Sequence, residues 1–145
     1  MLIEVRTPSQ LSFEAYLRVY AREVRSPSEE AWAYDRVLDF LFHPETVLCV
    51  WSVDGRYRSA LRLEPWRDGF LLNTLATAPE DQGRGYATAI VRAVLDRYSP
   101  VYSHISHDNA ASIRVHEKCG FRRIADVASL LDGTVTSRMA SYQYP

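Results

Sequence analysis

Residues 77–87, which read Thr-Ala-Pro-Glu-Asp-Gln-Gly-Arg-Gly-Tyr-Ala, are the stretch of this sequence most suggestive of chemistry. They form a short turn with glycines at positions 83 and 85, between an apolar segment and an amphipathic one. Glycines immediately before a helix leave several backbone N–H groups without partners, and the helix dipole is positive at that end. This pattern predicts an anion site, and a pyrophosphate is an anion that such a site can bind.

The segments on either side of this turn predict the elements that hold it. Residues 70–76 form a short, mostly apolar run, which predicts a strand. From residue 84 to about 97, apolar side chains recur at spacings of three and four, which predicts an amphipathic helix ended by Ser99-Pro100. The turn is therefore expected to join the end of a strand to the N-terminus of a helix.

The N-terminal half is predicted to contain two helices and three strands. Ser9 and Ser28 are the expected N-caps of the helices, and His43-Pro44 ends the second one. The turn Asp54-Gly55 lies between two β-branched and aromatic runs, which is typical of a hairpin. The predicted strands are residues 2–6, 47–53 and 57–63.

The C-terminal half continues the alternation. A strand is predicted at residues 101–106, a short helix at 110–118, and a final hairpin of residues 121–130 and 135–142 around Asp132-Gly133. The complete order predicts an α/β (α+β) fold with a mixed, mostly antiparallel central sheet of about seven strands and helices on both faces.

Composition limits the classes of protein that fit. The 145 residues are 47% hydrophobic and 24% charged, which predicts one globular domain over residues 1–145. Lys and Arg number 17 and Asp and Glu number 18, so the formal net charge is −1. Because so small a net charge produces no strong field, neither nucleic acid nor a membrane surface is an expected partner.

The cysteines and histidines do not predict a disulfide or a metal site. Cys49 and Cys119 are the only cysteines and lie far apart, which is typical of a reduced, cytoplasmic protein. His104 and His107 are three residues apart on a predicted strand, so their side chains are expected on opposite faces. No metal is therefore expected. The N-terminal residues do not read as a signal peptide.

Two motifs resemble those of the GNAT family of N-acetyltransferases. The first is Gln82-Gly83-Arg84-Gly85-Tyr86-Ala87, which is similar to the family's pyrophosphate loop. The second is Asn109-x-x-Ser112-x-x-x-His116-x-Lys118-x-Gly120-Phe121, which is similar to the family's Asn…Tyr-x-Lys-x-Gly-Phe signature. The resemblance implies that acetyl-CoA is the cofactor. It also implies transfer of an acetyl group to a primary amine by direct attack on the thioester, without a covalent enzyme intermediate.

The resemblance also implies which residues hold coenzyme A. The backbone of the glycine turn would bind the pyrophosphate, the Leu75 N–H would polarise the thioester carbonyl as an oxyanion donor, and Thr77 would pair with the pantetheine arm. Asn109 would hydrogen-bond the same arm, although it also suits a plain helix N-cap. The full implied set is Leu75, Thr77, Gln82, Gly83, Arg84, Gly85, Tyr86, Ala87, Thr88, Asn109 and Ser112.

Position 116 departs from the family pattern, which has a tyrosine thought to protonate the departing thiolate. His116 is a candidate general acid because imidazole can donate a proton near neutral pH, and a structural histidine is the alternative. No general base stands out, and ordered water could serve. The side chains considered for it are Asn73, Thr74, Tyr57, His107, Glu64 and Glu23.

The acceptor and the assembly state are left open by the sequence. A small-molecule amine and a peptide amine fit equally, and the loop with Arg25, Ser26 and Glu29 is expected to cover the acceptor site. The sequence also leaves open a homodimer that pairs through the last strand, which contains Tyr142 and Tyr144. An acyl-CoA-binding sensor without turnover is the rival function, favoured by the change at position 116. A nucleotide-binding protein is weaker, because the turn lacks the Lys-Ser/Thr of a phosphate-binding loop.

Overall fold

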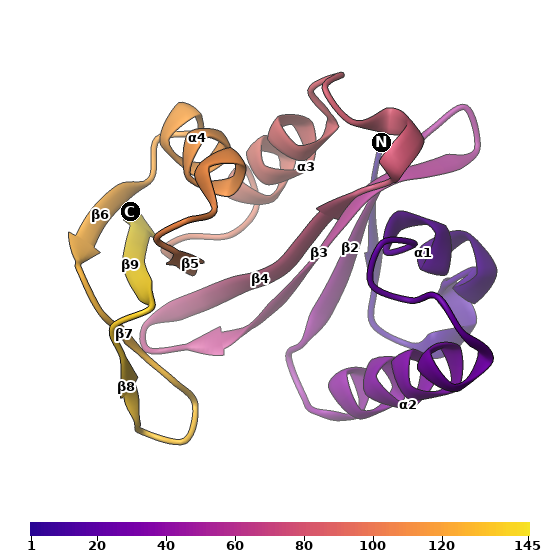
Figure 1. The fold of residues 1–145 in the computed structure, drawn as a ribbon, viewed down its shortest axis with the longest axis horizontal. Helices are drawn as coiled ribbons and strands as arrows, with labels where there is room; N and C mark the ends of the chain where they lie inside the picture. The colour runs from indigo at the N-terminus through magenta and orange to yellow at the C-terminus, as the bar shows by residue number, and fades with distance from the viewer.

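The computed structural model describes residues 1–145 and is built around a seven-stranded sheet (Figure 1). Every neighbouring pair of strands is antiparallel except β4 and β5, which are parallel. The predicted mixed, mostly antiparallel sheet is therefore confirmed. In spatial order the strands are β1 (Leu2–Val5), β2 (Val47–Val53), β3 (Arg56–Trp66), β4 (Gly69–Thr77), β5 (Val101–Ser106), β9 (Met139–Tyr144) and β6 (Arg122–Ala125).

Helices cover both faces of this sheet, as predicted (Figure 1). One face carries two of them and the opposite face the other two, and each pair seals a separate hydrophobic core. The helices are α1 (Phe13–Val19), α2 (Pro27–Phe42), α3 (Tyr86–Leu95) and α4 (Ala110–Lys118), with short 3-10 turns η1 (Pro8–Gln10) and η2 (Pro79–Asp81). None of the helices combines the length and apolarity needed to cross a bilayer.

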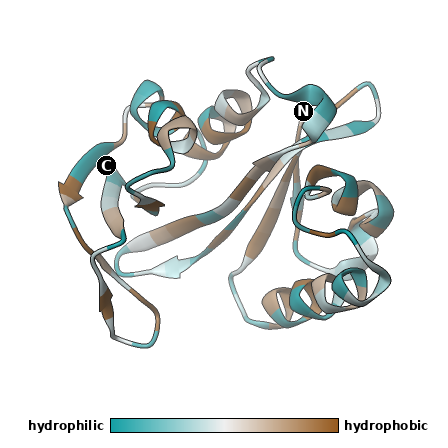
Figure 2. Cartoon of the chain, viewed as in Figure 1, coloured by the Kyte–Doolittle hydropathy of each residue, from teal (hydrophilic) through white to brown (hydrophobic).

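The two cores follow from the alternation of side chains along the central strands. In β2, Val47 and Cys49 pack into the core under α3, whereas Leu48 and Val50 pack under α1 and α2. Successive strand side chains point to opposite faces, so a continuously apolar strand can serve two helix layers. The colouring of Figure 2 shows this apolar band along the central strands.

Two predicted helix caps are wrong by a few residues. Ser12, not Ser9, caps α1, because residues 8–10 form the separate turn η1. Ser26, not Ser28, caps α2, and its hydroxyl accepts a hydrogen bond from the Glu29 N–H at 3.2 Å. Pro27 occupies the first helical position, where a missing N–H costs nothing, so the residue before it becomes the cap.

The predicted C-terminal hairpin is confirmed in outline, because its two arms pair antiparallel with each other, but the pairing is interrupted and divided between two sheets. The segment after α4 forms the short strand β6, which pairs with β9, while β7 (Ala128–Ser129) and β8 (Val135–Thr136) form a separate two-stranded sheet. β9 lies between β5 and β6, and it buries Ala140 and Tyr142. A central position in the sheet buries both edges of β9, which hairpin periodicity alone does not reveal. The turn at Asp132-Gly133 is retained, now between β7 and β8.

The corrected cap of α2 gives a test of the fold. Replacing Ser26 by alanine removes the acceptor for the Glu29 N–H, so Ser26→Ala should lower the free energy of unfolding by about 1 kcal/mol in urea titrations. Ser28→Ala is the matched control, since Ser28 lies inside the first turn and should change the free energy by less than half as much. An equal loss in both variants would contradict the assignment.

Candidate active site

One strand irregularity shapes the centre of the molecule. Between Asn73 and Ala76, β4 has one residue more than the facing part of β3, so a β-bulge forms at Thr74 and Leu75. Thr74 has a φ of 56°, a left-handed conformation that is uncommon for a β-branched residue. The Tyr20 hydroxyl, at the end of α1, donates a hydrogen bond to the Thr74 carbonyl at 2.7 Å. This contact ties α1 to the bulge.

Next to the bulge, β4 and β5 separate. Their parallel pairing consists of Phe70 with Val101, Leu71 with Tyr102, and Leu72 with Ser103. β4 continues to Thr77 and β5 to Ser106, but no further pairs form between them. The strands therefore diverge, and the residues of β4 beyond Leu72 have no strand partner on that side.

The glycine turn has a backbone that only glycine adopts easily. Gly83 and Gly85 have φ values of 76° and 85°, and Gly85 is the N-cap of α3. A Cβ atom added to either would meet nothing within 4 Å, so the space next to both is open. The turn therefore presents free space at the N-terminus of a ten-residue helix, which is what an anion needs.

A buried ion pair fixes the start of this turn. The Asp81 carboxylate, only 1% exposed, lies 2.8 Å from the Arg58 guanidinium of β3. The Ala78 N–H donates to the Arg58 carbonyl at 2.9 Å, and the Ser59 hydroxyl donates to the Tyr86 carbonyl at 3.0 Å. β3 thus holds both ends of the segment between β4 and α3. Composition and motif reasoning did not single out Asp81, although an acidic residue before a glycine turn was visible in the sequence.

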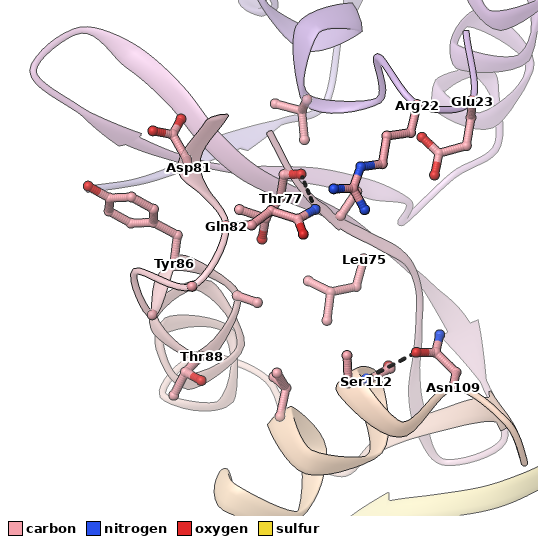
Figure 3. Close-up of a pocket in the computed structure, with 17 residues that line it drawn as sticks. Arg22, Glu23, Leu75, Thr77, Asp81, Gln82, Tyr86, Thr88, Asn109 and Ser112 are labelled. Carbon is pink, nitrogen blue, oxygen red and sulfur yellow. Dashed lines mark hydrogen bonds between the residues drawn. The ribbon is translucent and has the colours of Figure 1, made fainter. Parts of the chain in front are cut away.

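The other wall of the opening is the N-terminus of α4. The Asn109 side chain caps this helix, because its Oδ1 accepts a hydrogen bond from the Ser112 N–H at 3.2 Å. The capping role considered from the sequence is confirmed. Figure 3 shows Asn109 and Ser112 facing Leu75 across the opening.

These elements enclose a cavity of about 500 Å³, the α3 cavity (Figure 3). Every residue of the implied cofactor set lines it except Arg84, whose side chain is exposed and lies 3.9 Å from Asp81. The Gln82 amide donates to the Thr77 carbonyl at 3.4 Å within the wall. The residues that the sequence did not assign to this wall are Val19, Arg22, Ala76, Asp81, Ala111 and Val115, together with Glu23, which had been considered only as a base.

Arg22 is the functional candidate that sequence reasoning missed. It follows the end of α1 and projects into the α3 cavity, on the side opposite the glycine turn (Figure 3). Nothing in its sequence neighbourhood distinguishes it from other arginines on the first helices. Only the tertiary position of α1, held by Tyr20 and the bulge, brings it to the opening.

His116 is placed apart from the cavity. It is 1% exposed, packs edge-on against Phe121 with ring centroids 4.8 Å apart, and is not among the residues that line the α3 cavity. Its Nδ1–H donates to the Ser112 carbonyl at 2.7 Å, and its Nε2 has no partner. Burial lowers the pKa of His116, partly offset by that hydrogen bond. The structure therefore gives His116 the surroundings of a packed histidine, which lies behind Ser112 of the cavity wall and does not itself line the cavity.

The cysteines are packed as well. Cys49 and Cys119 are both buried free thiols, and burial raises the pKa of Cys49 to about 12 and also raises that of Cys119. A thiol held neutral is a weak nucleophile. Neither thiol is therefore a candidate nucleophile. No three His, Cys, Asp or Glu side chains gather where they could hold a metal ion.

A second cavity of about 400 Å³ lies beside the same strands and is called the β5 cavity here. Two of the side chains considered as a base from the sequence, Glu64 and Asn73, line it. Of the other candidates, Tyr57 accepts a hydrogen bond from the Ser12 N–H, and the His107 ring contacts the Asp126 carbonyl. The complete lining is Glu64, Leu71, Asn73, His104, Leu130, Leu131 and Asp132.

Residues 13–121 match the model of the acetyltransferase (GNAT) family, which covers most of the chain and both motifs. The chain belongs to the GNAT family. No curated protein sequence matches the GNAT chain.

Solved structures of similar fold include other acetyltransferases. The ribosomal-protein-S18-alanine N-acetyltransferase from Escherichia coli is 17% identical with a TM-score of 0.64, over 99% of this chain and 91% of that one. An aminoglycoside 6'-acetyltransferase type Ii is 13% identical with a TM-score of 0.73, over 99% and 96%. A GNAT acetyltransferase from Bacillus cereus ATCC 10987 is 14% identical with a TM-score of 0.70, over 99% and 96%. Identities this low establish a common fold only.

The burial of His116 predicts a pH dependence of stability. Its pKa is lowered in the folded GNAT chain, so the unfolded chain binds more protons once the pH falls below about 6.5. This group therefore contributes stability above pH 6.5 that is lost towards lower pH. His116→Phe keeps the aromatic packing on Phe121 and removes the titration, so its free energy of unfolding should fall less steeply between pH 7 and 5 than that of the wild type, measured by urea titration.

His107→Gln is the control for this slope, because His107 is exposed and its ring contacts only a backbone carbonyl. It should reproduce the wild-type dependence. A His116→Phe slope as steep as that of the wild type would show that His116 is protonated equally in both states.

Proposed function

We propose that this GNAT chain transfers the acetyl group of acetyl-CoA to a primary amine, by direct attack of the amine on the thioester. The observation that carries the proposal is the divergence of β4 from β5 beside the left-handed glycine turn. A linear molecule with an anionic end suits this geometry, because the glycine turn can bind the anionic group while the remaining chain of the ligand lies between the diverging strands.

The glycine turn is the proposed pyrophosphate site. Backbone N–H groups of residues 83–88 lie at the N-terminus of α3, where hydrogen bonds and the helix dipole favour negative charge. Asp81 is a carboxylate in the same wall, but Arg58 pairs with it at 2.8 Å. The pair limits the repulsion that an uncompensated carboxylate would exert on a phosphate. Arg22 adds a positive charge on the far side of the cavity.

The unpaired part of β4 is the proposed site of the pantetheine arm and the thioester. Backbone groups of Leu75 and Thr77 have no β5 partner, so they can hydrogen-bond an extended ligand as a neighbouring strand would. The Leu75 N–H is the proposed donor to the oxygen that gains negative charge as the amine attacks. A fixed donor of this kind contributes about 3 kcal/mol to transition-state stabilisation. Asn109 and Ser112 would flank the same arm from α4.

One observation favours a second function, an acyl-CoA-binding sensor without turnover. His116 stands where the family has a tyrosine, and it is buried away from the α3 cavity. The proposed enzyme therefore releases the thiol without a proton from this side chain. A sensor and an enzyme share the cofactor site but differ in whether free thiol appears.

Two measurements test the proposed function. Acetyl-CoA at 100 times its Kd should stabilise the folded chain by about 2.7 kcal/mol and raise Tm, whereas ATP and NAD should leave Tm unchanged. Thiol release should then be followed with spermidine, kanamycin and a peptide with an N-terminal alanine. Thiol release with any of these amines supports the enzyme, and stabilisation without release supports the sensor. No rise in Tm at millimolar acetyl-CoA would overturn both.

The glycine turn can be tested separately. Gly85→Ala places a Cβ at a φ of 85°, which costs about 1 kcal/mol of stability, and it fills the open space proposed for the pyrophosphate. Its Kd for acetyl-CoA should rise on the order of tenfold by isothermal titration calorimetry. Gly55→Ala is the matched control, since Gly55 has a φ of 74°, equally open surroundings and no place in the cavity wall. It should lose similar stability and keep its affinity. Equal affinities in both variants would count against the pyrophosphate site.

A further inference from the structure

The β5 cavity opens on the face of the sheet opposite α3 and α4. Leu72 and Ile105 point into the core under α3, so their neighbours Asn73 and His104 point to the other face. Both of these side chains line the β5 cavity. The β5 cavity therefore lies on one face of β4 and β5, and α3 and α4 cover the opposite face of these strands.

Asn73 and His104 also mark where the strands begin to separate. The last pair between β4 and β5 is Leu72 with Ser103, and each of the two residues follows one member of that pair. Leu75, which lines the α3 cavity, is two residues further along β4. An atom held beside His104 is thus next to the point where the pairing of β4 with β5 ends.

The position of His104 is held by aromatic packing. Its ring meets that of Trp66 edge-on, with centroids 5.3 Å apart, and the Arg67 guanidinium lies over the Trp66 ring, 5.8 Å from its centroid. The charged groups that face this histidine are Glu64 from β3, Asp132 from the loop after β7, and Arg67 from the β3–β4 turn. Burial, and secondly the charge of Arg67, lowers the pKa of His104, while burial raises that of Glu64. At neutral pH the imidazole is free to accept a proton.

We propose that the β5 cavity holds the acceptor amine and that His104 is its general base. This inference rests on the proposed acetyl transfer. Glu64 and Asp132 supply negative charge for a primary ammonium, and Leu71, Leu130 and Leu131 supply apolar contact for a carbon group next to it. The acceptor class is therefore a primary ammonium carried beside an apolar group.

The proton balance of the step is simple. An imidazole nitrogen of His104 takes one proton from the ammonium, which leaves a neutral amine with a free lone pair. As the C–N bond forms and the C–S bond breaks, the nitrogen loses a second proton, which solvent carries to the thiolate. The products are the acetamide and free coenzyme A, and His104 returns its proton to water.

The proposal can be tested with the fastest amine of the panel above. His104→Gln keeps a polar side chain of similar length but cannot accept the proton, so kcat at pH 7 should fall about 100-fold. The difference from the wild type should shrink as pH rises, because more of the amine is then already neutral. The rise in Tm on adding acetyl-CoA should stay at the wild-type value, because His104 does not line the α3 cavity.

His107→Gln is the matched control on the same strand end. Its ring contacts the Asp126 carbonyl at 2.9 Å and lines neither cavity, so its kcat and pH profile should equal those of the wild type. In His104→Ala, added imidazole should restore part of the lost rate. A His104→Gln enzyme with wild-type kcat at pH 7, or an unchanged acid limb, would overturn the assignment while leaving acetyl transfer in place. A wild type without thiol release would instead defeat the proposed function.

A readout without turnover completes the test. The ring protons of His104, assigned by NMR through the loss of their signals in His104→Gln, should titrate below pH 6.5 in the wild type. Adding the amine should shift these signals, and His107 signals should not move. A titration midpoint above pH 7, or no shift with amine, would contradict a neutral base in the β5 cavity.

Discussion

The separation of β4 from β5 is the constraint on which the rest of the site depends. Three residue pairs hold the two strands together, and beyond them the bulge at Thr74 gives β4 a different course. The Tyr20 hydroxyl, at the end of α1, hydrogen-bonds the bulge, so the packing of α1 on one face is tied to the point where the strands separate. The glycine turn, the cap of α4 and the two cavities are all arranged around this opening.

The polar contacts near the opening anchor the ends of the glycine turn and leave its middle exposed. Arg58 and Ser59 of β3 hold the ends of the segment between β4 and α3, which leaves its glycine backbone facing free space. A short loop without such anchors would lose conformational entropy when it binds a ligand. The buried Asp81 therefore acts on the site as a positioning residue, through the backbone that it fixes.

Local patterns predicted the parts of this fold that depend on local interactions. The helical stripe ending at Leu95, the glycine turn and the Asn109 cap are set by residues close in sequence, and the sequence identified them. The position of β9 between two strands, the bulge at Thr74 and the place of Arg22 in the cavity wall depend on contacts between distant segments. No spacing rule encodes these contacts, so they had to come from the structure. His116 shows the same limit, because the motif fixes the places of His116 and Phe121 in the sequence but not the burial and edge-on packing of their rings.

The short pairing between β4 and β5 divides the sheet into two half-sheets. One consists of β1 to β4, and the other of β5, β9 and β6. Besides the three residue pairs, they are joined by the hydrophobic core that both share and by the packing of α3 against α4. A ligand lying in the opening would touch both halves, through β4 and the glycine turn on one side and through Asn109 on the other. A bound ligand would then connect the two half-sheets directly. The movement of one half-sheet relative to the other would therefore differ between the free and the liganded protein.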